Sequence, residues 1–179
     1  MEKLKPYLVI LATVGMIAMN YLASQGYIGG TTASEISNSY PTFVTPSGYA
    51  FTIWAWIYLG LIIFSVYQAL PSQLEKFANM RTLYLISCAL NCLWIYFWHH
   101  EQITVSLLVI LTYLASLALI NVALPKENNL FPRFLFGMNF GWVTAASIIN
   151  ATIALIYLGV RTTEQTAIWL AAGLLVVAT

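Results

Sequence analysis

The sequence predicts an all-α integral membrane bundle of five transmembrane helices, followed by the start of a sixth. Of its 179 residues, 60% are hydrophobic and only 7% are charged, which leaves too little polar surface to cover a water-soluble globule of this size. The apolar residues also fall into separate runs, each close to the about 17 to 25 residues that cross a bilayer. Because no repeat, low-complexity tract or soluble segment interrupts these runs, we expect one membrane domain over residues 1–179.

The first span is predicted over residues 7–23. A basic start before an apolar run is also typical of a signal peptide. The run is long enough to cross the membrane, however, and the small-residue pattern around Ala23 makes a weak cleavage site, so we expect a retained helix. Residues 24–39 are polar and rich in Gly, Ser and Thr, and we expect an external loop there.

The second span is predicted over residues 49–70, directly after a loop stiffened by Pro41 and Pro46. Pro71 ends it, because proline disfavours helical backbone in the residue before it. The stretch from Pro41 to Tyr58 therefore sets a rigid loop against the aromatic start of a helix. We expect a ligand to contact this junction.

Three further spans are predicted over residues 80–98, 103–124 and 134–159. The fourth span is mostly Leu, Ile, Val and Ala and suggests a lipid-facing wall, whereas the fifth carries more polar residues than anchoring requires. A last apolar run covers residues 166–179. Its about fourteen residues, at about 1.5 Å each, reach about 21 Å, short of the about 30 Å hydrocarbon core. It is either a partial helix or the sign of a longer chain.

Basic residues favour an orientation for the bundle. They lie before the first span and in or beside alternate loops: Lys3, Lys5, Lys76, Arg81, Lys126 and Arg133, with Arg161 alone in the fifth loop. The positive-inside rule then places the N-terminus in the cytoplasm and the first loop outside.

Several functions are disfavoured by the residues present. A net charge of +1 without a Lys/Arg cluster argues against a nucleic-acid partner. All acidic residues lie in loops or at the N-terminal end, so no span carries the ionisable group of a proton-driven carrier. We find no catalytic or metal-binding motif and expect no permanent cofactor. His99 and His100 suggest a haem ligand, but adjacent helical residues point about 100° apart, so we interpret them as an interfacial helix end.

Polar and aromatic residues within the spans allow two readings each. Asn91 and Asn150 are interpreted as hydrogen-bonding links between helices, a role that also lets them shape a cavity wall. Trp54, Trp94 and Trp142 either pack between helices and at interfaces or form the wall of a cavity for a flat apolar ligand. Composition does not choose between these readings.

Three blocks of the chain carry a family pattern. Residues 43–46 (FVTP) precede Trp54 with the spacing of a W-x-P-P motif and a later Trp, residues 90–97 match L-N-x-x-W-x-x-F, and residues 138–150 are similar to P-Y-x-x-W-x-x-x-A-x-x-x-N. In this order they resemble the tryptophan-rich sensory protein family, also called the translocator protein or TspO/MBR family. Phe43, Thr45 and Met138-Asn139 depart from the motifs, and the sixth run is additional, so the chain resembles a divergent, extended member with an altered cavity rim.

The resemblance implies a five-helix bundle, often dimeric, whose cavity is closed by the first loop. It implies a receptor or sensor that binds a tetrapyrrole (porphyrin or haem) or a sterol-like lipid, with membrane lipid and a homodimer or larger membrane complex as further partners. The alternatives are an accessory subunit of such a complex, or an enzyme of light-dependent porphyrin breakdown acting through Trp54 or Trp142. The expected ligand-binding residues are Phe43, Pro46, Phe51, Trp54, Tyr58, Asn91, Trp94, Trp142, Ala146 and Asn150.

Overall fold

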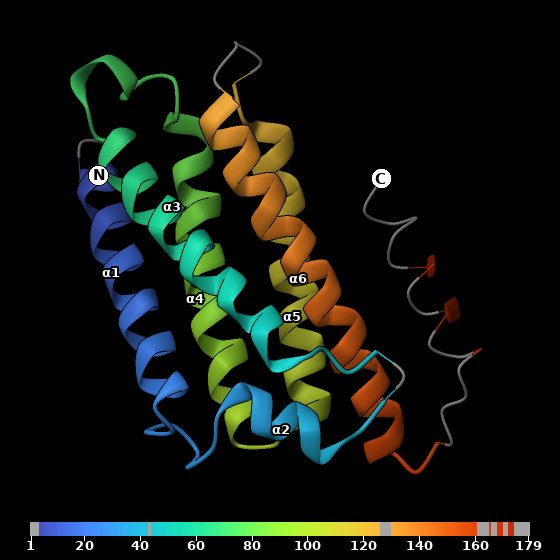
Figure 1. Ribbon diagram of the computed structural model, residues 1–179. Helices are drawn as coiled ribbons and strands as arrows, with labels where there is room; N and C mark the ends of the chain where they lie inside the picture. The colour runs from blue at the N-terminus through green and yellow to red at the C-terminus, as the bar shows by residue number, and fades with distance from the viewer. Residues whose placement is uncertain are drawn as a thin grey trace.

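The computed structural model describes residues 4–42, 44–125 and 130–160, together with Gln165, Ile168, Trp169, Ala172 and Gly173. All regular structure in this part of the chain is helical (Figure 1). The elements are α1 (Lys5–Ser24), α2 (Ala33–Ser39), η2 (Gly48–Thr52), α3 (Ile53–Tyr67), η3 (Pro71–Gln73), η4 (Ala78–Met80), α4 (Arg81–His99), α5 (Ile103–Ala123) and α6 (Leu130–Tyr157), the η elements being 3-10 helices. Five helical segments among the described residues are long and apolar enough to cross a membrane, which confirms the predicted fold class.

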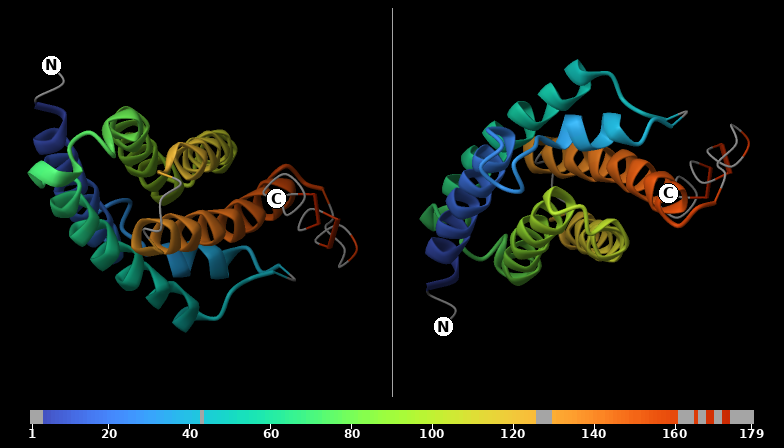
Figure 2. Two further views of the ribbon diagram at one scale, coloured as in Figure 1. Left: turned by 90° about the horizontal axis from the view of Figure 1, so that it is seen from above. Right: turned by 90° about the horizontal axis from the view of Figure 1, so that it is seen from below.

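The five long helices pack as a closed ring. Each contacts two neighbours, in the order α1, α3, α6, α5, α4 and back to α1, and Figure 2 looks along this ring from both ends. Order in the ring therefore differs from order in the chain: α3 packs against α1 and α6, while α4, which follows it, packs against α1 and α5. This leaves room between α3 and α4 for the site described below.

The helix boundaries follow local chemistry. In α1, Pro6 sits at the start, where a missing N–H costs nothing, and in α6, Pro132 occupies the first turn for the same reason. α6 begins at Leu130, before the expected start at residue 134, and ends at Tyr157. Of the apolar run 166–179, Ile168, Trp169, Ala172 and Gly173 are helical and exposed, and the rest lies outside the described residues.

α5 is a lipid-facing wall on one side only. Leu108, Leu119 and Val122 are exposed, as expected, but Tyr113 and Leu117 belong to an opposite face that is buried between α4 and α6. Hydropathy alone did not reveal the second face, because lipid and protein interior are equally apolar.

The predicted first loop, residues 24–39, contains a short helix. Residues 33–39 form α2, which lies across one end of the bundle (Figure 1) and buries Ile36 and Ser37. Its start is a capping box: the Thr32 hydroxyl accepts from the Glu35 backbone N–H at 3.3 Å, and the Glu35 carboxylate accepts from the Thr32 backbone N–H at 2.7 Å. The T-x-x-E pattern of residues 32–35 is typical of a helix start and could have predicted α2 from the sequence.

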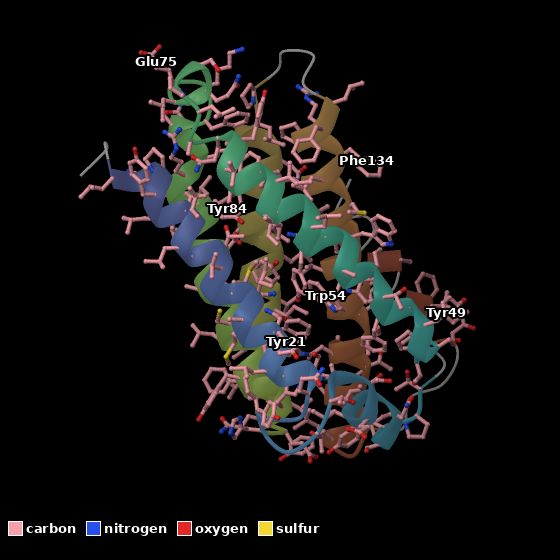
Figure 3. All side chains as sticks on the ribbon, turned by 60° about the vertical axis from the view of Figure 1, so that its left-hand side comes forward. Tyr21, Tyr49, Trp54, Glu75, Tyr84 and Phe134 are labelled. Carbon is pink, nitrogen blue, oxygen red and sulfur yellow. The ribbon has the colours of Figure 1, made fainter. Side chains whose placement is uncertain are left out.

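Basic residues gather at the opposite end. Within the described part of the chain the basic residues are Lys5, Lys76, Arg81 and Arg133. They lie at or near those helix ends that are on the opposite side of the bundle from α2 (Figures 1 and 3). This asymmetry agrees with the alternation of basic loops. The cytoplasmic location of the N-terminus stays a prediction.

Candidate functional site

A cavity of about 360 Å³ lies between α1, α3 and α4, beneath α2. Figure 3 shows Tyr21 of α1 and Trp54 of α3, two of its lining residues, toward the end of the bundle where α2 lies. We call it the main cavity. Its lining residues are Ile17, Asn20, Tyr21, Ala23, Ser24, Thr32, Ala33, Ser34, Phe51, Trp54, Ala55, Tyr58, Ile95 and His99.

A second, smaller cavity of about 30 Å³ lies between α4 and α6, and we call it the inner pocket. It adjoins the main cavity, because Ala33 and Phe51 line both. α2 contributes side chains to both cavities and therefore acts as their cover. The inner pocket is lined by Ala33, Ser37, Phe51, Trp94, Trp98, Trp142, Ala146 and Ile149.

Trp54 lines the main cavity and contacts two tryptophans that line the inner pocket. Its ring stacks on Tyr58, with centroids 5.2 Å apart and planes at 19°, since the two lie one helical turn apart. It meets Trp94 of α4 at 6.2 Å and 33°, and Trp142 of α6 edge to face at 6.1 Å and 87°. Three helices thus meet at one indole, and its contacts with Tyr58 and Trp142 have the stacked and edge-to-face geometries that ring quadrupoles favour.

These aromatic contacts extend in two directions from Trp54. Phe51 meets Trp142 edge to face at 6.1 Å, and Trp94 meets Trp98 at 6.4 Å and 38°. Because Trp94 and Trp98 are four residues apart on α4, both rings face the inner pocket. The result is a continuous aromatic surface from the main cavity to the inner pocket.

Polar atoms without partners gather in the same region. The indole N–H groups of Trp94, Trp98 and Trp142, the Ser37 hydroxyl and His99 Nε2 are buried and make no hydrogen bond within the described structure. An unsatisfied buried polar group costs about 1–3 kcal/mol. All five belong to residues that line the two cavities.

Asn91 and Asn150 link helices, in agreement with their first interpretation. Asn20 Nδ2 donates to Asn91 Oδ1 at 2.6 Å between α1 and α4, and Asn150 Nδ2 donates to Ser106 Oγ at 2.9 Å between α6 and α5. Asn20 also lines the main cavity, so the first bond holds a wall residue in place. Neither Asn150 nor Ser106 lines a cavity.

The expected ligand-binding residues divide into three groups. Phe51, Trp54 and Tyr58 line the main cavity, and Phe51, Trp94, Trp142 and Ala146 line the inner pocket. Pro46, Asn91 and Asn150 line neither. Phe43 lies outside the described residues.

Several lining residues escaped the sequence interpretation. Trp98 lies one helical turn after Trp94, and this spacing could have predicted that both rings face the same pocket. The lining residues of α1 and α2 could not be predicted in this way, because their position depends on the tertiary fold. His99 and His100 lie at the end of α4, as expected, but their surroundings differ: His99 is only 3% exposed and lines the main cavity, while His100 is exposed.

Two contacts hold the cover in place. Gly29, at φ +71°, lies so close to the His99 carbonyl that no Cβ would fit between them. After α2, Tyr40 Oη donates to Glu101 Oε2 at 3.0 Å. Partial burial and this carboxylate raise the pKa of Tyr40, while the Thr32 N–H and hydroxyl lower the pKa of Glu35.

Comparisons with known proteins add one finding. A family model described as TSPO-like protein matches residues 6–179. No curated protein and no solved structure matches the chain. The described residues contain no group of three or more His, Cys, Asp or Glu side chains placed to hold a metal ion.

Proposed function

We propose a specific ligand for this chain, which belongs to the TSPO-like protein family and is a multi-pass membrane protein of ligand-binding or sensor type. We infer that the main cavity and the inner pocket together bind a flat hydrophobic molecule of the tetrapyrrole class, with α2 covering it. The binding itself requires no covalent chemistry from the protein.

The observation that carries this proposal is the meeting of three indoles at Trp54. Trp54, Trp94 and Trp142 come from three different helices and adjoin one another at the boundary of the two cavities. Aromatic rings offer a large contact area to a flat π-system. A tetrapyrrole presents such a system on both faces.

The unpaired polar atoms favour a tetrapyrrole over a sterol-like lipid. Four residues that line the inner pocket carry a buried polar atom without a partner: three indole N–H donors and a serine hydroxyl. A porphyrin carries propionate oxygens that accept several hydrogen bonds, whereas a sterol brings a single hydroxyl. Filling these vacant donors removes a penalty of about 1–3 kcal/mol for each group.

The size of the site supports the same ligand class. The main cavity holds about 360 Å³, within the about 300–1,000 Å³ range of small-molecule sites. Its lining is mostly apolar, with a few polar groups, as is typical of such sites.

Fluorescence titration of the detergent-solubilised full chain with protoporphyrin IX tests the proposal. We expect saturable tryptophan quenching, and an affinity about tenfold lower for Trp54→Ala and for Trp142→Ala, which corresponds to about 1.4 kcal/mol each. Trp56→Ala is the matched control, because Trp56 is two residues from Trp54 but 67% exposed on the outer surface. Absent saturation, or equal affinities in all four proteins, would reject the proposal.

A competition experiment separates the two ligand classes. Cholesterol added to the porphyrin complex should leave the quenching unchanged if the site is built for a tetrapyrrole. Displacement at concentrations similar to those of the porphyrin would instead assign the site to sterol-like lipids.

A further inference from the structure

The main cavity lies where α1 and α3 diverge. The two helices meet at the basic end of the bundle, where Gln68 Nε2 of the α3 end donates to the Pro6 carbonyl oxygen of α1 at 3.0 Å. Toward the α2 end they separate, and Figure 3 shows Tyr21 on α1 and Trp54 on α3 in this diverging part. Both residues line the main cavity, so the cavity lies between the separated halves of the two helices.

Three residues that line the cavity are also on the outer surface of the bundle. Tyr21 is 63% exposed, and Ser24 of α1 and Ala55 of α3 are exposed as well. A side chain that belongs both to a cavity wall and to the outer surface marks an opening. We call the gap between α1 and α3 at Tyr21, Ser24 and Ala55 the lateral opening.

The lateral opening faces lipid rather than water. Its two sides belong to the segments Lys5–Ser24 and Gly48–Tyr67, which are both long and apolar enough to cross a membrane. Tyr21 lies one turn before the end of α1, and tyrosine is enriched where a membrane meets water. The opening therefore lies in the leaflet nearer to α2, close to the level of the lipid headgroups.

On the water side, the cover is attached at both of its ends. Before α2, Gly29 packs on the His99 carbonyl, and after α2, Tyr40 Oη donates to Glu101 Oε2 at 3.0 Å. A ligand that entered beneath α2 from water would have to break such contacts. A ligand that passes between α1 and α3 leaves both of them in place.

We propose that the main cavity takes up its hydrophobic ligand sideways from the bilayer, through the lateral opening, while α2 stays closed. This inference rests on the proposed function and adds the route by which the ligand reaches the site. Apolar surface leaves water favourably, so a hydrophobic molecule concentrates in the bilayer. The lipid beside α1 and α3 therefore offers the protein more ligand than the water above α2.

Two substitutions that change the width of the opening in opposite directions test the route. The full chain in phosphatidylcholine vesicles is mixed with protoporphyrin IX, and tryptophan quenching is followed by stopped flow. Ala55→Phe should slow association and dissociation alike by about tenfold, whereas Tyr21→Ala should speed both, because an entrance acts on both rates. Ala89→Phe on α4 is the matched control, since Ala89 is exposed and lines neither cavity.

A third substitution tests the alternative route beneath the cover. Tyr40→Phe removes the hydroxyl that bonds Glu101 and so loosens one end of α2. If the ligand enters sideways, this variant should bind and release protoporphyrin IX at the wild-type rates. Faster rates in Tyr40→Phe, or wild-type rates in Ala55→Phe, would reject the lateral route. Misfolding does not explain a slower and a faster variant at the same opening.

A measurement without porphyrin separates this inference from the proposed function. In vesicles of brominated phosphatidylcholine, acyl chains that reach the lateral opening should quench Trp54, and the difference between wild type and Trp54→Phe isolates this contribution. Ala55→Phe should reduce the contribution of Trp54, and Ala89→Phe should not. If the wild type binds no porphyrin, the proposed function fails, whereas an unquenched Trp54 rejects the lateral opening itself.

Discussion

The rings of Trp142 of α6 and Trp54 of α3 meet edge to face, with centroids 6.1 Å apart and planes at 87°. This is the aromatic contact that brings α3 and α6 together beside the cavities.

A double-mutant cycle measures that contact. Edge-to-face aromatic pairs contribute about 0.5–1.5 kcal/mol beyond the area they bury. We expect Trp54→Leu and Trp142→Leu to be non-additive by about this amount in the free energy of unfolding, measured in mixed micelles. Additive effects would show that the two rings contribute independently.

The bond from Asn20 to Asn91 should stabilise the packing of α1 on α4. Interhelical hydrogen bonds in membranes contribute about 0.6 kcal/mol on average and up to about 1.7 kcal/mol. Because it is 2.6 Å long and both side chains are buried, this bond should lie in the upper part of that range. A cycle of Asn20→Leu and Asn91→Leu, read from unfolding in mixed micelles, should give that coupling. Asn121→Leu on α5 serves as a control that should not couple to either.

Alanine substitutions at Gly29 and Gly30 distinguish the cost of backbone strain from the cost of a steric clash. Both have positive φ, +71° and +78°, but only Gly29 faces the His99 backbone, whereas nothing lies near Gly30. Gly30→Ala should cost only the left-handed conformation, about 1–2 kcal/mol. Gly29→Ala should cost more, because the added Cβ would meet the His99 carbonyl. Equal losses of thermal stability in the two variants would contradict the contact.

Acid should loosen the start of α2. The Thr32 backbone N–H and hydroxyl lower the pKa of Glu35 in the folded protein, so the folded state binds fewer protons there than the unfolded state. The stabilisation is therefore present above the unfolded pKa of Glu35 and is lost as pH falls through the lowered folded value. Hydrogen exchange of the α2 amides should become faster over this range, after correction for the intrinsic pH dependence.

Two variants check this explanation of the pH effect. Glu35→Gln retains a capping residue without a charge, so it should remove the pH dependence while keeping the helix. Thr32→Val removes the hydroxyl partner and should speed exchange at all pH values. A pH dependence that persists in Glu35→Gln would point to another group.

The sequence predicted the parts of this protein that depend on short stretches of chain. The span expected over residues 80–98 is α4, Arg81–His99, because its length and hydropathy suffice to define it. The expected trio Trp54, Trp94 and Trp142 does come together, although its role in ligand binding remains a prediction.

What the sequence did not predict depends on contacts between distant segments. His99 is buried because residues 25–30 fold over the end of α4 and bring Gly29 against it, a contact across seventy positions of the chain. The buried face of α5 likewise exists only once α4 and α6 flank it. Hydropathy and short motifs do not predict which distant segments will pack together.

The ring order has a consequence for biosynthesis. α1 and α3 are synthesised first and can pair at once, but α3 finds its second neighbour only in α6, the last of the five long helices to leave the ribosome. Until α6 is inserted, Trp54 lacks Trp142 and the inner pocket lacks one side. The two cavities therefore form at different stages: the main cavity needs only the segments from α1 to α4, whereas the inner pocket is completed when α6 is inserted.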